Sequence, residues 1–161
     1  MIHIEPMQVE HAHDVLRIYA EGLVTGFSTF NTEVPTWEEW DRNHLPHTRL
    51  VATESAEVLG WVALLPVSSR SCYRGVAEFS IYIAARHRGR GIADQLMRAM
   101  IEKSEANGIW TLQSSTFADN LTSLRLQERH GFRQIGYRDR IAQLHGVWRN
   151  TILLERRSDK F

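Results

Sequence analysis

One stretch of the sequence places basic and glycine residues directly after an apolar run. The apolar run covers residues 79–84 and predicts a buried strand. A loop follows, Arg86-His87-Arg88-Gly89-Arg90-Gly91, and a helical pattern then begins at Ile92. N–H groups at a helix N-terminus lack partners, the helix dipole favours negative charge there, and glycine lets a ligand approach the backbone. The stretch predicts a phosphate or pyrophosphate site, although a plain tight turn would also explain the glycines.

Glu78 is the carboxylate that stands at the start of this strand. It lies near the place where an activated group on a ligand bound at the glycine loop could be presented. A carboxylate in that position is a candidate for proton transfer. The alternative is a structural role, in which Glu78 forms an ion pair with Arg74 or Arg70.

A second pattern lies further along the chain, from Asn120 through Ser123 to Gly131 and Phe132. Asn120 is a good N-cap for a helix and Gly131 a good terminator, so structure alone accounts for both residues. Asn120 and Ser123 also lie on one helix face, where they could contact a ligand beside the sheet.

The elements that must position these residues alternate between strand and helix patterns. Thr36 is a plausible N-cap, and Asn107-Gly108 a plausible C-cap. The predicted order is β-α-α-β-β-β-α-β-α-β-β, which favours one α+β domain over residues 1–161 around a mixed sheet. We predict strands over residues 1–5, 49–53, 58–65, 76–84, 109–116, 132–141 and 147–156, and helices over residues 9–23, 37–45, 89–107 and 120–130.

Composition limits the partners of the protein. The 161 residues carry 19 Lys plus Arg and 19 Asp plus Glu, so we expect neither a nucleic-acid nor a membrane partner. Cys72 is the only cysteine, which excludes an internal disulfide. The histidines lack metal-ligand spacing, so we expect no metal. No signal peptide or membrane span is evident, and cytoplasmic localisation is expected.

Together the two patterns resemble the GNAT acetyltransferase superfamily. Its acetyl-CoA signature is Arg/Gln-x-x-Gly-x-Gly/Ala, which is present here as Arg88-x-x-Gly91-x-Ala93. The superfamily's Asn-x-x-Ser/Ala helix is matched by Asn120 and Ser123. The element order agrees as well, so the resemblance covers nearly the whole chain and implies a mostly antiparallel sheet of about seven strands flanked by about four helices.

Within that superfamily, three further motifs resemble the phosphinothricin N-acetyltransferase family. They are Arg70-x-x-Tyr73, residues 77–83 (Ala-Glu-Phe-Ser-Ile-Tyr-Ile) and Gly146-x-Trp148. Members of this family acetylate the α-amino group of phosphinothricin and, in relatives, of methionine sulfoximine and methionine sulfone. The resemblance also implies a homodimer, with the Trp148 tail as one contact surface.

The resemblance implies a role for each matching residue. Acetyl-CoA is the expected co-substrate, and Glu78 matches the family's proposed general base, which would take the proton of the attacking ammonium by direct transfer or through water. The implied cofactor contacts are Ile81, Tyr82, Ile83, Arg88, Gly89, Arg90, Gly91, Ile92, Ala93, Asp94, Asn120 and Ser123.

The substrate is expected to be a small amino acid. A guanidinium suits its carboxylate in two-point geometry, and Arg70 matches the family's arginine, with Arg74 as an alternative. Two solvated loop arginines are the structural alternative. The implied substrate contacts are Phe27, Arg70, Tyr73, Arg74, Glu78, Phe79 and Ser80. Phe27 and Tyr73 could equally be core or dimer surface.

The chain departs from the superfamily at one functional position. Many members place a tyrosine just before the Glu of the helix over residues 120–130, as acid for the leaving thiolate, but Gln127 occupies that position here. Glutamine cannot protonate a thiolate. Either Tyr82 or water does so, or the thiolate leaves unprotonated, which its modest pKa permits.

The leading hypothesis is therefore direct acetyl transfer from acetyl-CoA to the α-amino group of methionine sulfoximine, methionine sulfone or phosphinothricin. The alternatives are a different amine, such as a polyamine, an aminoglycoside or a protein N-terminus, and a CoA-binding module without turnover. The basic residues around Arg70 argue against polycationic substrates.

Overall fold

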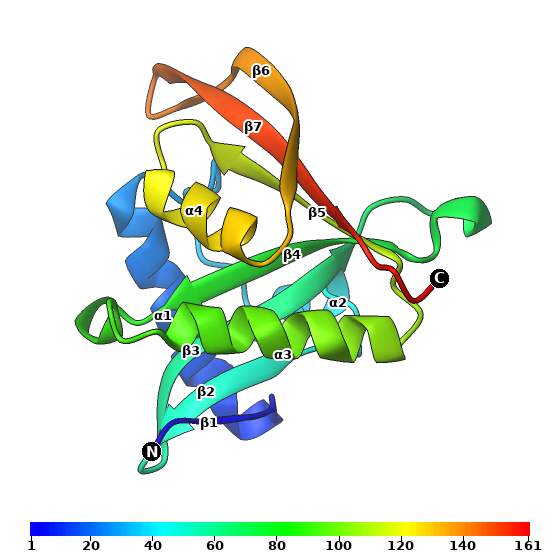
Figure 1. The fold of residues 1–161 in the computed structure, drawn as a ribbon. Helices are drawn as coiled ribbons and strands as arrows, with labels where there is room; N and C mark the ends of the chain where they lie inside the picture. Colours follow the sequence, from blue (N-terminus) through cyan, green and yellow to red (C-terminus); the bar gives the residue numbers. More distant parts are fainter.

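A computed structural model describes all residues, 1–161, as seven strands and four α-helices with short 3-10 turns (Figure 1). The predicted α+β class and element order are confirmed. The elements are β1 (His3–Pro6), α1 (Ala12–Thr25), α2 (Trp37–Asn43), β2 (Leu50–Glu54), β3 (Glu57–Pro66), β4 (Val76–Ile83), α3 (Ile92–Ala106), β5 (Thr111–Phe117), α4 (Leu121–Arg129), β6 (Arg133–Leu144) and β7 (Val147–Arg157), with 3-10 turns η1 (Val9–His11), η2 (Ser71–Tyr73) and η3 (Ala85–His87).

The sheet has the order β1-β2-β3-β4-β5-β7-β6, and every pair is antiparallel except β4–β5. That parallel pair is short, because it covers only the pairings from Val76–Thr111 to Glu78–Gln113. Beyond Glu78 the two strands separate, and β4 keeps a strand partner only on its β3 side. In Figure 1, β4 and β5 run together at the right and diverge toward the left.

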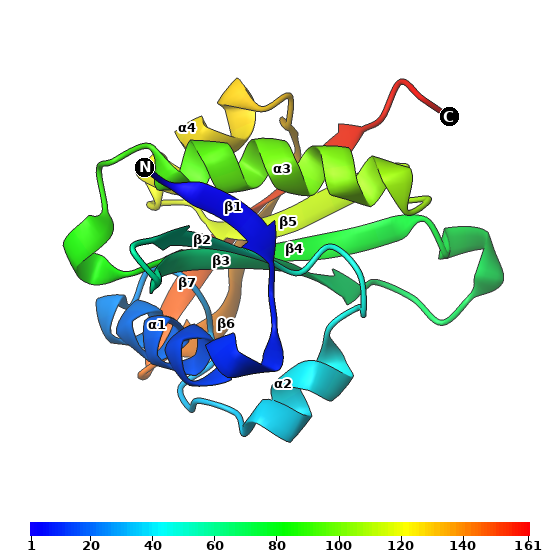
Figure 2. The same ribbon diagram turned by 90° about the horizontal axis from the view of Figure 1, so that it is seen from below.

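Helices cover both faces of the sheet. Figure 2 shows α3 and α4 on one side and α1 and α2 on the other. Successive strand side chains point to opposite faces, and β4 follows that rule. Phe79 packs into the core under α3, whereas Tyr82 packs against the second core under α1 and α2. The face that holds Tyr82 therefore also receives Glu78 and Ser80.

Local capping agrees with the predicted boundaries in part. The Thr36 side chain accepts a hydrogen bond from the Glu39 N–H, as predicted for the α2 N-cap. The predicted start of the third helix at Gly89 is wrong, because α3 begins at Ile92. Gly89 and Gly91 have φ angles of 79° and 76°, which a right-handed helix excludes. They form the turn that precedes the helix instead.

Candidate active site

A cleft of about 980 Å³ occupies the gap where β4 and β5 separate. Its walls come from β4, β5, the loop before α3, the start of α4 and the loop after α1. The cleft brings together every predicted cofactor contact except Arg90. These predicted contacts span 42 positions of the sequence, from Ile81 to Ser123, and line one cavity.

The β4 edge supplies backbone groups to this cleft. Past Glu78, the edge of β4 that faces β5 has no strand partner. An exposed strand edge presents N–H and C=O groups to an extended ligand, which can pair with it like another strand. Residues 81–83 line the cleft along this edge.

The glycine turn ends the cleft at the N-terminus of α3. Gly91 is the N-cap residue, in the left-handed conformation, and no side chain caps the helix. An added Cβ at Gly89 or Gly91 would meet no atom within 4 Å, so the positive φ angle rather than crowding requires glycine there. The first N–H groups of α3 are free of intrahelical partners and suit an anion.

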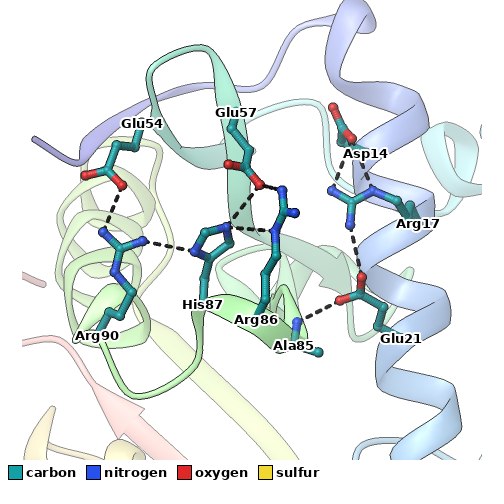
Figure 3. A network of polar contacts seen from close by, with 9 residues as sticks. All are labelled: Asp14, Arg17, Glu21, Glu54, Glu57, Ala85, Arg86, His87 and Arg90. Carbon is teal, nitrogen blue, oxygen red and sulfur yellow. Dashed lines mark hydrogen bonds and ion pairs between the residues drawn. The ribbon is translucent and has the colours of Figure 1, made fainter.

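The basic residues of this loop divide into two groups (Figure 3). Arg90 forms an ion pair with Glu54 at 2.8 Å, and the Arg86 guanidinium pairs with Glu57. Both carboxylates belong to the β2–β3 hairpin. Arg88 forms no hydrogen bond or ion pair within the chain and lines the cleft. The Arg90 side chain, held by Glu54, lies outside the cleft lining, so a cofactor contact from Arg90 stays a prediction.

His87 connects the two ion pairs. Its Nε2 lies 3.0 Å from Glu57 Oε1, and its Nδ1 lies 3.0 Å from an Arg90 guanidinium nitrogen (Figure 3). Burial and the charges of Arg86 and Arg90 lower the pKa of His87. The neutral ring can donate from Nε2 to Glu57 and accept at Nδ1 from Arg90, and the Arg86 Nε also lies 3.2 Å from Nε2. The loop is thus fastened to the β2–β3 hairpin.

A further contact fixes the beginning of the loop. The Ala85 N–H donates to Glu21 Oε2 at 2.7 Å, and Arg17 holds the same carboxylate from one helical turn away (Figure 3). The loop is therefore anchored to α1 as well. Pre-organised backbone donors bind a ligand with less loss of conformational entropy.

Asp94 lines the cleft, but its carboxylate has partners within the chain. His130 Nε2 lies 2.9 Å from Oδ1, and Arg129 donates to both carboxylate oxygens at 3.1 Å. Burial opposes ionisation, yet the hydrogen bonds from His130 and Arg129 together lower the pKa of Asp94. Its carboxylate joins α3 to α4, so the group it can offer an anion is its backbone N–H.

Glu78 lies at the point where β4 and β5 separate and lines the cleft. Its half-buried carboxylate has no hydrogen bond or ion pair within the chain. Burial raises the pKa of Glu78, and the charge of Arg138 on β6 opposes that rise. The structural alternative for Glu78 is wrong, because Arg70 lies over the Tyr73 ring and Arg74 over the Trp110 ring instead. Nothing in the sequence indicates Arg138, which is 60 residues away from Glu78.

The predicted substrate contacts divide into two sets. Phe27, Phe79 and Ser80 line the cleft with Glu78. The other three, Arg70, Tyr73 and Arg74, belong to the loop around η2 and lie outside the cleft lining. Figure 1 shows this loop at the right, at the opposite end of β4 from the glycine turn. Their contact with a substrate therefore stays a prediction, which the cleft lining of this chain does not include.

A second hollow, of about 320 Å³, adjoins the cleft on the α1 and α2 face. Ser80 and Tyr82 line both cavities. Two carboxylates, Glu33 and Glu39, also line the hollow, together with aromatic side chains that include Trp40 and Trp61. Sequence reasoning missed this hollow, because its walls come from α1, α2, the loop between them and two strands, β3 and β4.

The start of α4 forms another wall. Asn120 accepts a hydrogen bond from the Ser123 N–H at 3.2 Å, which confirms the capping interpretation. Its side-chain amide donates to the Phe27 carbonyl at 3.1 Å and so ties the loop after α1 to α4. Asn120 and Ser123 both line the cleft, so the structural and ligand interpretations are compatible.

Tyr82 is a poor proton donor in this structure. Its ring packs edge-on against Tyr19, with centroids 5.0 Å apart. Burial raises the pKa of Tyr82 far above its ordinary value, and a hydrogen bond with Ser28 only partly offsets that effect. Tyr82, one of the two candidate proton donors to the leaving thiolate, therefore holds its proton more tightly than a free tyrosine does.

Comparison with known proteins decides the family. The model of the Acetyltransferase (GNAT) family matches residues 12–132. The chain belongs to the GNAT acetyltransferase family. It is 31% identical over 152 residues to a phosphinothricin N-acetyltransferase of Alcaligenes faecalis, covering 88% of this chain and 75% of that protein.

Two other acetyltransferases extend the comparison. An L-methionine sulfoximine/L-methionine sulfone acetyltransferase of Pseudomonas paraeruginosa is 31% identical over 107 residues, which cover 66% of this chain and 62% of that protein. The crystal structure of a phosphinothricin acetyltransferase of Sinorhizobium meliloti in complex with acetyl-CoA superposes with a TM-score of 0.88 over 97% of this chain and 88% of that one, at 22% identity. The predicted GNAT fold and enzyme class are confirmed.

Two structural findings accompany this assignment. No group of three or more His, Cys, Asp or Glu side chains is arranged to hold a metal ion. None of the helices is both long enough and apolar enough to traverse a lipid bilayer.

Proposed function

We propose that this GNAT protein transfers the acetyl group of acetyl-CoA to the α-amino group of a small amino acid of the methionine sulfoximine, methionine sulfone or phosphinothricin type. The observation that carries the proposal is the position of Glu78, an unpaired carboxylate at the mouth of the split between β4 and β5. The named relatives support the substrate class.

The donors that line the cleft suit acetyl-CoA. Arg88 and the α3 N-terminus would hold the pyrophosphate, and the free edge of residues 81–83 would align the pantetheine arm. Bound acetyl-CoA supplies a thioester carbonyl as acceptor for the amine. Glu78 would take the proton that the ammonium must lose before its nitrogen can attack. A carboxylate whose pKa burial raises is a stronger base than an exposed one.

The two faces of β4 would separate the ligands. Glu78 and Ser80 point toward the α1 and α2 face, where the second hollow adjoins the cleft. The N-terminus of α3 lies on the opposite face (Figure 2). The amine would therefore enter from the α1 and α2 side, while the cofactor would pass through the split. Arg138, whose charge acts on Glu78, is a candidate partner for the carboxylate of an amino-acid substrate.

A homodimer is part of the proposal. Arg70, which precedes η2, and Tyr73 lie outside the cleft of their own chain, so they could meet a substrate only in the cleft of a second copy. The β6–β7 hairpin at the sheet edge exposes several apolar side chains, Ile135, Tyr137, Ile141, Val147 and Trp148. Edge strands with exposed apolar groups favour association. Light scattering should give twice the 18.6 kDa chain mass, and Trp148→Ser should shift it toward the monomer.

A different amine is the second candidate. Glu33 and Glu39 give the second hollow two carboxylates, and no Lys or Arg lines it, which favours a cationic substrate such as a polyamine. The loop of Arg70 and Arg74, whose charges argued against polycationic substrates, does not line this hollow.

We expect the reaction to take place in the cytoplasm, where acetyl-CoA is made and used.

Thiol release from acetyl-CoA by the full chain tests these alternatives with methionine sulfoximine, methionine sulfone, phosphinothricin, spermidine and kanamycin. Release with the first three supports the proposed substrate class. Release with spermidine or kanamycin alone replaces it with the cationic class. Acetyl-CoA binding in calorimetry without release for any amine would identify a binding module and refute the proposed enzyme function.

A further inference from the structure

Gln127 is a fully buried amide on α4, at the position where many superfamily members carry a tyrosine. Only 1% of the residue is exposed. Its Nε2 donates to Thr116 Oγ1 at 2.8 Å and to Ser123 Oγ at 3.1 Å. Its Oε1 accepts a hydrogen bond from the Ser114 hydroxyl. All four side chains line the cleft, on the face of β5 that α4 covers.

In this network one hydroxyl hydrogen, that of Ser123, has no acceptor. Both Nε2 hydrogens of Gln127 are used, and the Ser114 hydrogen is used on Oε1. Thr116 lies 3.2 Å from Ser114 Oγ and can donate to it. Ser123 accepts from Gln127, and its own hydrogen has no acceptor within the chain. A hydroxyl that accepts from an amide N–H is also polarised and becomes a better donor.

We propose that Ser123 donates a hydrogen bond to the sulfur that leaves during acetyl transfer, and that Gln127 is the positioning residue that aims it. The inference rests on the proposed function. In the reaction a C–N bond forms and the C–S bond breaks, with its electron pair staying on sulfur. Ser123 keeps its proton, because an alcohol is a far weaker acid than a thiol, and the thiolate later takes a proton from solvent.

The positions of Glu78 and Ser123 agree with these two roles, base for the amine and hydrogen-bond donor to the sulfur. Glu78 points toward the α1 and α2 face of β4, where the amine would enter. Ser123 lies on α4, on the opposite face. The incoming nitrogen and the departing sulfur are different substituents of one carbon, so the base for the nitrogen and the donor for the sulfur can act from the two faces of the sheet.

The test is the pKa of the thiol of bound CoA, followed by the ultraviolet absorbance of the thiolate as pH rises. This readout needs no amine and no turnover. A hydrogen bond to a charged group corresponds to a shift of roughly one to two pKa units. We expect the bound thiol to titrate that much lower in the wild-type protein than in Ser123→Ala. Ser123→Thr, which keeps a hydroxyl, should retain the low value, and Gln127→Leu should lose most of the shift.

Controls separate this inference from the function on which it rests. Desulfo-CoA, which lacks the thiol, should bind the wild type and Ser123→Ala equally. Ser104→Ala removes another buried helix hydroxyl, away from the cleft, and should leave the thiol pKa unchanged. Equal thiol pKa values in the wild type and Ser123→Ala, with CoA bound and amines acetylated, would overturn the inference alone. Failure of CoA to bind would overturn the proposed function with it.

Discussion

Replacing Glu78 by glutamine should make the protein more stable and far less active. The carboxylate is half-buried, has no hydrogen bond or ion pair, and has its pKa raised by burial, with only the charge of Arg138 opposing. A group whose pKa is raised on folding is disfavoured in its charged form, so at neutral pH the ionised Glu78 destabilises the native state. Glutamine has nearly the same shape and removes that charge.

The size of the gain follows from the environment of the carboxylate. An unsatisfied buried polar group costs about 1–3 kcal/mol, and more when charged. Solvent still reaches part of Glu78, and the glutamine amide also lacks a partner, so we take the low end, about 1 kcal/mol. For a chain of this length that corresponds to a rise in Tm of about 2–4 °C.

The gain should depend on pH with a definite sign. Below the ordinary pKa of a glutamate, Glu78 is protonated in both the folded and unfolded states and the two proteins should melt alike. As pH rises through the ordinary value to the raised value, the wild type loses stability and the variant does not. The difference in Tm should therefore open between acidic and neutral pH and stay constant above.

Calorimetric melting across that pH range measures the stability, and thiol release on an accepted amine measures activity. Loss of a general base should lower kcat by about 10²–10⁴-fold at neutral pH. Glu102→Gln is the matched control, because Glu102 is exposed on α3 and has no partner. A variant that melts below the wild type, or a Tm difference independent of pH, would contradict the desolvation argument. Undiminished kcat would remove Glu78 as the base.

Three further changes test the rest of the site. Arg88→Ala should weaken acetyl-CoA binding about tenfold in calorimetry, because a charged contact to phosphate is lost. Arg90→Ala should weaken binding much less, because the Arg90 side chain pairs with Glu54. Equal losses of affinity would contradict the division of the loop arginines. Gly22→Ala would place a Cβ 2.6 Å from the Tyr82 ring, so kcat and Tm should both fall, and an unchanged Tm would show that the ring moves freely. Asn120→Ala should lower Tm by about 2–4 °C through the lost cap, and Asn120→Asp, which keeps the cap oxygen, should lower it less.

The sequence alone determined those features that depend on a few neighbouring residues. The strand, glycine turn and helix around Gly91 follow from local periodicity and from the positive φ that glycine tolerates. The caps at Thr36 and Asn120 are contacts with N–H groups three residues away. The element order, the α+β class and the cofactor motif were therefore predictable, and the boundary error at the start of α3 is a matter of three residues.

Only the tertiary structure decided which charges and polar groups meet. Arg90 is held by Glu54 and Gln127 by Ser114, partners that lie 36 and 13 positions away in the sequence. The early separation of β4 from β5 leaves Glu78 at the cleft mouth, and the loop of Arg70 ends up outside that cleft. A basic run in a sequence cannot show which of its side chains is neutralised, because the neutralising carboxylate arrives from wherever the chain folds back. Burial and partners, which set the basicity of Glu78, exist only once the sheet has formed.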